Sequence, residues 1–148
     1  GIKKRFDILT ASRKFVLIDD YAHHPTEIKA TLRSVFEYAK LLGITKITAI
    51  FQPHRFTRLS ANLEAFKECF EGIDELVILP VYAAGETPID INLKEEFKRY
   101  NPVMTQKVAR EGEGIAFTDE FGVKNLLDDG LVIGFGAGDI TYQLRGDV

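Results

Sequence analysis

The sequence predicts an α/β fold in three layers: a mainly parallel, Rossmann-like sheet with helices on both faces. Short continuous apolar runs alternate along the chain with longer segments in which apolar residues recur every three or four positions. Strands that alternate with helices imply right-handed crossovers, and therefore a parallel sheet covered on both sides. The 148 residues, 45% of them hydrophobic, suit one domain with a proper core.

The first strand and helix have the clearest signals. Residues 15–18 form a continuous apolar run that ends at two aspartates, as in strands buried on both faces. A helix is expected over residues 25–42, where the apolar residues form one stripe. Pro25 suits the first helical position and Gly43 the position just beyond the last turn.

The later elements follow from the same patterns. Gly85 and Pro88 mark a loop, and a helical stripe over residues 59–70 includes Cys69, which we expect to be a buried small hydrophobe. The other expected elements are strands at residues 47–51, 76–79, 115–117 and 131–135, and short helices at 92–100 and near 119–128.

Bulk properties exclude several classes of protein. The formal net charge of −3 and the charged fraction of 28% indicate no nucleic-acid surface. No stretch approaches the roughly 18 apolar residues of a membrane span. The single cysteine cannot form an internal disulfide. We therefore expect a cytoplasmic location, with no membrane and no nucleic-acid partner.

Polar, aromatic and glycine residues gather where the predicted strands end. Parallel sheets bind ligands beyond the carboxyl ends of their strands. All three histidines of the chain lie in two of these segments. The segments are residues 19–24, 52–55, 81–86 and 136–139. This edge of the sheet is the predicted site.

The first segment combines two carboxylates, a phenol and two imidazoles. Asp19 and Asp20 suit turn or capping chemistry, but a carboxylate here can also accept both hydroxyls of a ribose. Tyr21 could lie against a base. His23 and His24 could cap the helix or fill space; because adjacent residues point differently, one is expected to reach the cleft while the other supports it. No further cysteine or histidine pair has the spacing of a zinc site.

The second segment places two arginines at the start of a helix. Arg55 and Arg58 are three apart and share a face. Two cations are poorly placed for the dipole of a helix N-terminus, unless an anion lies between them. The alternative is a solvated basic face.

The last segment is glycine-rich. Residues 134–139 would let the backbone approach a ligand or another part of the chain. Thr141 stands where a dinucleotide-binding motif has its third glycine, and the sequence contains no P-loop. The chain therefore lacks the usual means to cradle a triphosphate by itself.

Four motifs together resemble one family. They are DDYAHHPTE (residues 19–27), FQPHRFTR (51–58), VYAAGE (81–86) and GAGDI (136–140). In order and spacing they resemble the C-terminal domain of UDP-N-acetylmuramate–L-alanine ligases. KRFD at residues 4–7 resembles that family's junction with its central domain. The resemblance implies a junction over residues 1–12 and a C-terminal domain over 13–148.

The resemblance also implies an activity. Such ligases have a sugar-nucleotide domain, a central P-loop ATPase and this domain. ATP phosphorylates the lactyl carboxylate of UDP-N-acetylmuramate, and L-alanine attacks the acyl phosphate, in peptidoglycan synthesis. ATP and Mg²⁺ are the implied cofactors, with the Mg²⁺ ligands in the central domain. The 148 residues alone are expected to be inactive.

Individual roles carry over by position in these motifs. Asp20 would bind the ATP ribose, with Tyr21 beside the nucleotide, and Arg5 would reach the γ-phosphate. The residues implied on the amino-acid and phosphate side are His23, His54, Arg55 and Arg58, and, from a further loop, Tyr82, Ala84 and Glu86.

Two alternatives stay open. Ligases that recycle murein tripeptide share the first motif but lack the pair seen here as His54 and Arg55. A free-standing module that binds a nucleotide or anion without catalysis is the other class. The two classes differ in isolation: the 148 residues of a ligase domain should show no ATP-dependent joining of L-alanine and should bind ATP weakly.

Overall fold

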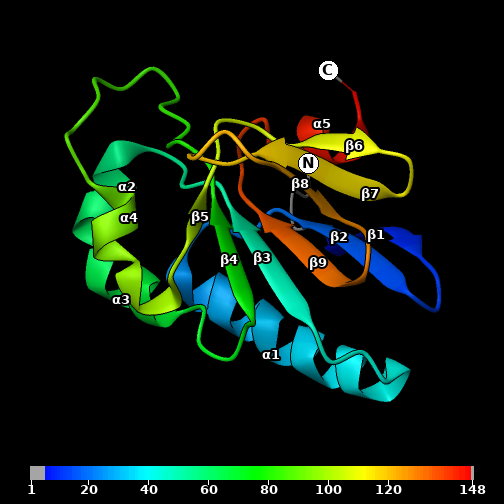
Figure 1. Ribbon diagram of the computed structural model, residues 1–148. Helices are drawn as coiled ribbons and strands as arrows, with labels where there is room; N and C mark the ends of the chain where they lie inside the picture. The colour runs from blue at the N-terminus through cyan, green and yellow to red at the C-terminus, as the bar shows by residue number, and fades with distance from the viewer. Residues whose placement is uncertain (1–5, 148) are drawn as a thin grey trace.

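The computed structural model describes residues 6–147, and its centre is a six-stranded sheet (Figure 1). The strand order is β1-β2-β9-β3-β4-β5, and every neighbouring pair is parallel except β1 with β2. The strands are β1 (Phe6–Ala11), β2 (Phe15–Asp20), β3 (Ile47–Phe51), β4 (Glu75–Ile78), β5 (Val103–Met104) and β9 (Gly130–Phe135). The predicted mainly parallel α/β fold is confirmed.

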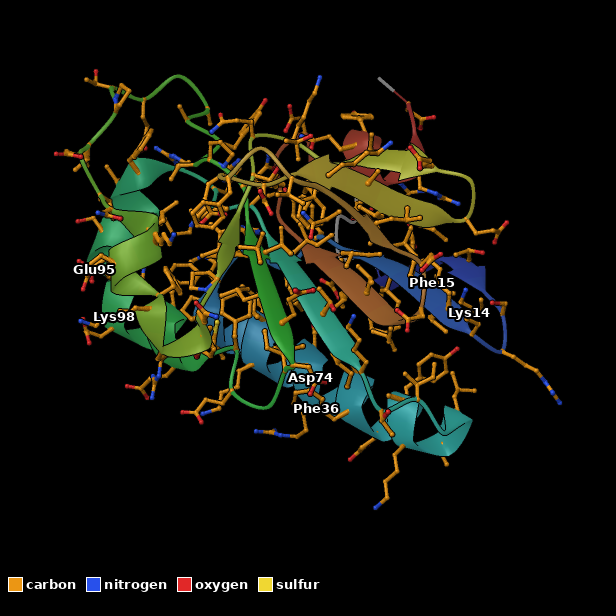
Figure 2. The ribbon with its side chains drawn as sticks, viewed as in Figure 1. Lys14, Phe15, Phe36, Asp74, Glu95 and Lys98 are labelled. Carbon is orange, nitrogen blue, oxygen red and sulfur yellow. The ribbon has the colours of Figure 1, made fainter. Side chains whose placement is uncertain are left out.

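Helix α1 (Pro25–Leu42) matches its expected bounds. Pro25 takes the first turn, where its missing N–H costs no hydrogen bond. Gly43 ends the helix at φ 72°, a left-handed conformation in which other residues are strained. Strand β3, which follows α1, is joined by a hydrogen bond to Asp74 in the turn before β4 (Figure 2). The Oδ2 atom of Asp74 accepts the Ile47 N–H at a distance of 2.8 Å.

One face of the main sheet is covered by helices. In Figure 1, α1 runs along the lower side of the sheet and the green helices lie at its left. The buried core on this side is rich in aromatic rings: Phe51 lies 5.0 Å from Phe70 and 6.0 Å from Phe97 between ring centroids. The further elements on this face are α2 (Phe56–Ala61), α3 (Leu63–Glu68), α4 (Leu93–Glu96) and the 3₁₀ helix η1 (Lys98–Tyr100).

Helices alone were expected on the other face of the sheet, but a small second sheet also covers it. A single helix, α5 (Ile140–Arg145), shares this core with a small antiparallel sheet at the upper right of Figure 1. That sheet has the order β6-β7-β8. Its strands are β6 (Ala109–Glu111), β7 (Gly114–Thr118) and β8 (Lys124–Leu127).

Two expected helices differ in the structure. The helix predicted near residues 119–128 is wrong: this segment is a turn followed by β8. Asp119 Oδ1 accepts the N–H groups of Phe121 and Val123, each at 2.9 Å, and Gly122 has φ 83°. The hydrogen bonds of the aspartate and the left-handed conformation of the glycine together form the hairpin turn. The single stripe over residues 59–70 is divided at Asn62 into α2 and α3.

Cys69 is buried, as expected, and its burial raises the pKa of the thiol to about 12, which keeps it protonated and unreactive. None of the helices among residues 6–147 combines the length and the apolar character needed to cross a membrane.

Candidate functional site

The segments that follow β2, β3, β4 and β9 meet at one edge of the sheet. Gly136 N–H donates to the Asp20 carbonyl at 3.2 Å, and Gln52 N–H donates to Phe135 O at 2.9 Å. His54 and Tyr82 form an isolated parallel bridge. The expected convergence at the carboxyl ends of the strands is confirmed, because backbone hydrogen bonds join the segments directly.

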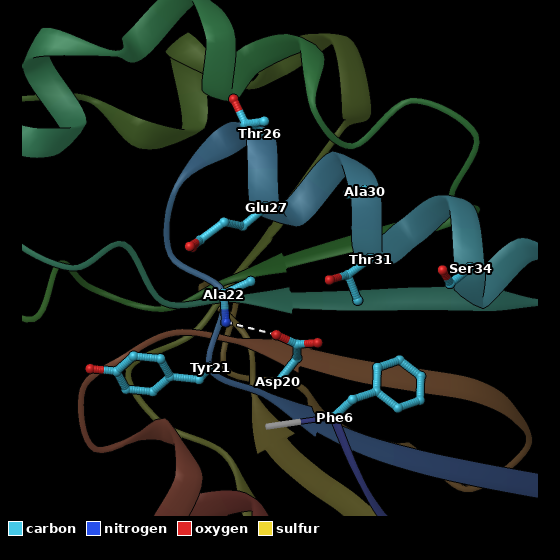
Figure 3. Close-up of a pocket in the computed structure, with 9 residues that line it drawn as sticks. All are labelled: Phe6, Asp20, Tyr21, Ala22, Thr26, Glu27, Ala30, Thr31 and Ser34. Atoms are coloured by element: carbon cyan, nitrogen blue, oxygen red, sulfur yellow. Dashed lines mark hydrogen bonds between the residues drawn. The ribbon is translucent and has the colours of Figure 1, made fainter. Parts of the chain in front are cut away.

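A cavity of about 460 Å³ opens between the end of β2 and the first turns of α1 (Figure 3). Its size is in the range of small-molecule sites. Figure 3 shows the Asp20 carboxylate between the aromatic ring of Phe6 and the helix, with Tyr21 at the rim. The lining residues are Phe6, Asp20, Tyr21, Ala22, Thr26, Glu27, Ala30, Thr31 and Ser34.

Asp20 is one of two carboxylates that line this cavity, the other being Glu27. Asp20 is 6% exposed, and its Oδ1 accepts the Ala22 N–H at 2.7 Å. Burial raises the pKa of the carboxyl group to about 6, although hydrogen bonds from Ala22 and Thr31 oppose the shift. At neutral pH Asp20 is therefore an ionised acceptor held in a partly apolar cavity.

Asp19 points to the opposite face of the sheet, as successive residues of a strand do. It is fully buried, and its Oδ2 accepts from Thr141 Oγ1 at 2.6 Å and from Arg145 Nη2 at 2.9 Å. Arg145 Nη2 also reaches Asp7 Oδ2 at 2.6 Å. This carboxylate therefore ties β2 to α5 and β1.

His23 lies next to the cavity, at the turn into α1. Its Nδ1 is 3.0 Å from the Tyr21 carbonyl and 3.9 Å from Glu27 Oε1. The same Glu27 oxygen accepts the backbone N–H groups of His23 at 3.2 Å and of His24 at 3.3 Å. Glu27 thus holds the turn that carries both histidines, and these hydrogen bonds lower its pKa against the opposing effect of burial. His24 is the exposed N-cap residue of α1.

His54 belongs to the same cluster. Its ring centroid lies 5.7 Å from that of His23, and its ring stacks on Tyr82 at 5.6 Å with an interplanar angle of 11°. Arg58 Nη1 contacts His54 Nδ1 at 3.0 Å and donates to the His54 carbonyl at 3.1 Å. Burial and the nearby Arg58 lower the pKa of His54, which favours the neutral ring.

Arg55 faces a carboxylate of the protein itself. Its Nη2 lies 3.1 Å from Glu86 Oε2, and the same carboxylate accepts from Thr57 Oγ1 at 2.5 Å and Thr57 N at 3.2 Å. These hydrogen bonds, led by that of the Thr57 hydroxyl, lower the pKa of Glu86. Arg55 has φ 74°, an unusual conformation for a residue with a side chain. The two arginines therefore have different partners, Glu86 for Arg55 and His54 for Arg58.

The glycine-rich turn brings two parts of the chain together. A Cβ atom at Gly138 would lie 2.5 Å from Tyr82 Cγ and 2.7 Å from Gln52 Oε1. Gln52 Nε2 donates to Asp139 Oδ1 at 2.7 Å, and Gln52 Oε1 accepts the Ile140 N–H at 3.2 Å. The expected close approach of another part of the chain is therefore confirmed at Gly138.

The remaining expected residues have varied positions. Ala84 lies exposed in the loop after β4 with φ 53°. Arg5 lies outside the described residues. Among residues 6–147, no group of three or more histidine, cysteine, aspartate or glutamate side chains is arranged to hold a metal ion.

The contacts of Thr57 with Glu86 and of Arg145 with Asp19 were not predicted from the sequence. A glutamate three residues after an N-cap is the usual signal of the capping role that Glu27 has.

The fold and site define an α/β domain with a small-molecule cavity and a separate histidine–arginine cluster on one sheet edge. Residues 4–116 match the family profile described as "Mur ligase, glutamate ligase domain". The chain belongs to the Mur ligase family and corresponds to its C-terminal domain.

Similar proteins agree with this assignment. Proteins named UDP-N-acetylmuramate–L-alanine ligase are 73% identical over 99% of the chain in Campylobacter curvus, 58% over 98% in Campylobacter jejuni (strain 81116) and 54% over 100% in Helicobacter pylori (strain 26695). The alignments cover 34%, 32% and 33% of those proteins, so the chain spans about a third of their length.

Proposed function

We propose that this chain is the C-terminal domain of a UDP-N-acetylmuramate–L-alanine ligase and supplies contacts to ATP and to L-alanine. The ligase forms an acyl phosphate from ATP and UDP-N-acetylmuramate, which the amine of L-alanine then attacks. The observation that carries this proposal is the arrangement of one sheet edge. The cavity at Asp20 and the cluster at His54 are two distinct places on this edge. Contacts join them: Tyr21 lines the cavity and contacts His23, whose ring lies against that of His54.

The cavity at Asp20 suits the nucleoside part of ATP. A buried, ionised carboxylate accepts the hydroxyl groups of a ribose. The ring of Phe6 and the side chains of Ala30 and Thr31 give the cavity a largely apolar lining for a base. Tyr21 at the rim would lie beside the nucleotide. Mg²⁺ ligands and the P-loop are expected elsewhere in the full-length protein.

The cluster at His54 suits the amino acid and the phosphate. Arg55 and Arg58 supply two guanidinium groups within one turn of chain, and arginine binds carboxylates and phosphates through paired hydrogen bonds. Arg55 is 46% exposed at its side chain, so the carboxylate of L-alanine can reach it beside Glu86. Tyr82, Ala84 and Glu86 form the loop on this side. Arg5 would reach the γ-phosphate from the segment before β1.

Two alternatives are less well supported. A ligase acting on murein tripeptide would lack the His54–Arg55 pair, which this chain has. The similar proteins from three bacterial species are named for the addition of L-alanine. A binding module without catalysis leaves the clustered histidines and arginines without a purpose.

The test is ATP-dependent joining of L-alanine to UDP-N-acetylmuramate, measured as product and released phosphate. The full-length protein should turn over, whereas residues 1–148 alone should not and should bind ATP weakly. Robust turnover by the 148 residues would contradict the division of labour.

Two substitutions in the full-length protein separate the two parts of the site. Asp20→Ala should raise the KM for ATP, because the ribose contact is lost. Arg55→Ala should lower kcat/KM for L-alanine. The fall should correspond to a loss of about 2–3 kcal/mol in transition-state stabilisation, as for the loss of a charge-assisted hydrogen bond. Arg13→Ala, in the exposed turn at the opposite end of β2, is the matched control and should leave both unchanged. Unchanged alanine kinetics in Arg55→Ala would contradict the carboxylate role.

A further inference from the structure

The hydrogen-bond partner of His23 determines which ring nitrogen carries the proton. Nδ1 lies 3.0 Å from the Tyr21 carbonyl, and a carbonyl oxygen can only accept. Nδ1 must therefore carry the hydrogen, and in the neutral ring Nε2 has the free lone pair. Glu27 Oε1 lies 3.9 Å from the same nitrogen. His23 is arranged as a base that accepts a proton at Nε2.

His54 has the opposite arrangement. Arg58 Nη1 is 3.0 Å from His54 Nδ1, and a guanidinium group can only donate. Nδ1 is therefore the acceptor, and the hydrogen of the neutral ring is on Nε2. The stack on Tyr82 and the second Arg58 contact, to the His54 carbonyl, hold the ring in place. His54 is arranged as a neutral donor.

We propose that His23 Nε2 removes the proton from the ammonium group of the incoming amino acid, while the His54 Nε2–H group holds an oxygen of the acyl phosphate. This assignment rests on the proposed ligase function and goes beyond it by naming the base. The two ring centroids are 5.7 Å apart, so an amine at His23 can lie next to an acyl-phosphate oxygen held by His54.

The chemical step balances with these two residues. The ammonium group gives one proton to His23 and becomes a neutral amine. Its lone pair forms the C–N bond with the acyl carbon, and the C–O bond to phosphate breaks with both electrons going to the phosphate oxygen. The second proton of the nitrogen leaves with the phosphate. His23 then returns its proton to solvent, and no oxidant or reductant is involved.

The groups that face His23 are consistent with this role. They are the Tyr21 ring at 5.1 Å, the His24 ring at 5.2 Å, the His54 ring at 5.7 Å and the Glu27 carboxylate. Burial and the nearby Arg58 lower the pKa of His54, which favours its neutral ring and so leaves no second cation beside His23.

The test uses amide substitutions that keep one ring nitrogen and delete the other, in the full-length ligase. His23→Asn keeps a donor near the position of Nδ1 and removes Nε2. It should lower kcat with L-alanine by about 10²–10⁴-fold, the usual contribution of a general base, with little change in the KM for ATP. The loss should shrink as pH rises, because L-alanine then supplies its own neutral amine. His24→Asn, at the exposed neighbour, is the matched control.

Hydroxylamine separates a base from a merely structural residue. It attacks acyl phosphates as a neutral amine, so it needs no base at neutral pH. With hydroxylamine in place of L-alanine, His23→Asn should form hydroxamate at the wild-type rate. For His54, the Gln variant keeps a donor near the position of Nε2 and should retain more activity than the Asn variant, which loses it.

The outcomes distinguish the two proposals. If the wild-type full-length protein joins no L-alanine, the proposed function fails and the base assignment fails with it. If the wild type is active but His23→Asn loses hydroxamate formation equally, or keeps the wild-type pH profile, only the base assignment is wrong. Thermal melting of each variant checks that the domain is folded.

Discussion

Two neighbouring carboxylates at the end of β2 have opposite surroundings. Asp19 faces α5, is fully buried and is held by Arg145 and Thr141. Asp20 faces α1 and lines an open cavity, where burial raises its pKa to about 6. The first carboxylate is compensated by a cation of the protein, whereas the second depends on a backbone N–H and a hydroxyl group. One strand end therefore carries an ion-paired structural charge on one face and, on the other, a charge that faces an open cavity.

The largest effect is expected on the Asp19 face. Arg145→Ala removes the cation that compensates two carboxylates, Asp19 and Asp7. Because Asp19 then stays buried without its ion pair, the free energy of unfolding should fall by about 2–4 kcal/mol, as measured by urea denaturation. Arg145→Lys keeps the charge but not the fork that reaches both carboxylates, so its loss should be smaller. If Arg145→Ala were as stable as the wild type, the claim that Arg145 stabilises the buried Asp19 carboxylate would be wrong.

On the Asp20 face the sign should reverse. The folded-state pKa of Asp20, about 6, is above its ordinary value of 3.8, so the ionised form is less stable in the folded state than in the unfolded chain. This cost is fully present above about pH 6 and disappears as pH falls toward 4. Asp20→Asn keeps the acceptor for the Ala22 N–H and removes the charge.

This variant should therefore raise the free energy of unfolding by about 1–2 kcal/mol at pH 7–8, with a smaller difference at pH 4. Urea denaturation at both pH values measures it. Asp19→Asn at pH 7 is the contrasting variant and should destabilise, because it weakens the ion pair with Arg145. A loss of stability in Asp20→Asn at pH 7 would contradict the comparison.

The smallest effects are expected from a matched pair of threonines. Thr141→Val deletes the hydroxyl that donates to Asp19 and should destabilise the fold by about 1 kcal/mol. Thr31→Val deletes the hydroxyl that lowers the pKa of Asp20, and should cost only a few tenths of a kcal/mol, because the cavity is open to water. Its main result should be a higher pKa of Asp20, measured by NMR titration. Similar losses of stability in both variants would contradict the expected difference between the surroundings of Asp19 and Asp20.

Much of the fold followed from local patterns, and the failures were also local. The bounds of α1 were predicted because its stripe, Pro25 and Gly43 all agree. The hairpin at Asp119 was predicted as a helix, because the turn made by the aspartate side chain was overlooked. Helix α5 was not expected, since its six residues are too few to show a period.

The candidate site was predicted as a place more completely than as a set of contacts. All the segments expected at the sheet edge meet there. The pairing of Arg55 with Glu86 and of Arg58 with His54 could not be predicted, because it depends on how the loop after β4 folds over the start of α2.

The sequence by itself determined five of the strands (β2, β3, β4, β7 and β9), the long helix and the edge of the sheet at which the polar residues collect. These depend on the period of apolar residues and on turn chemistry, which act over a few positions. Only the tertiary structure decided that Asp20 faces the cavity and Asp19 faces Arg145, 126 residues further along the chain. Strand β9 lies between β2 and β3 and brings α5 back over β2. The partner of a buried charge depends on that strand order, which no local pattern encodes.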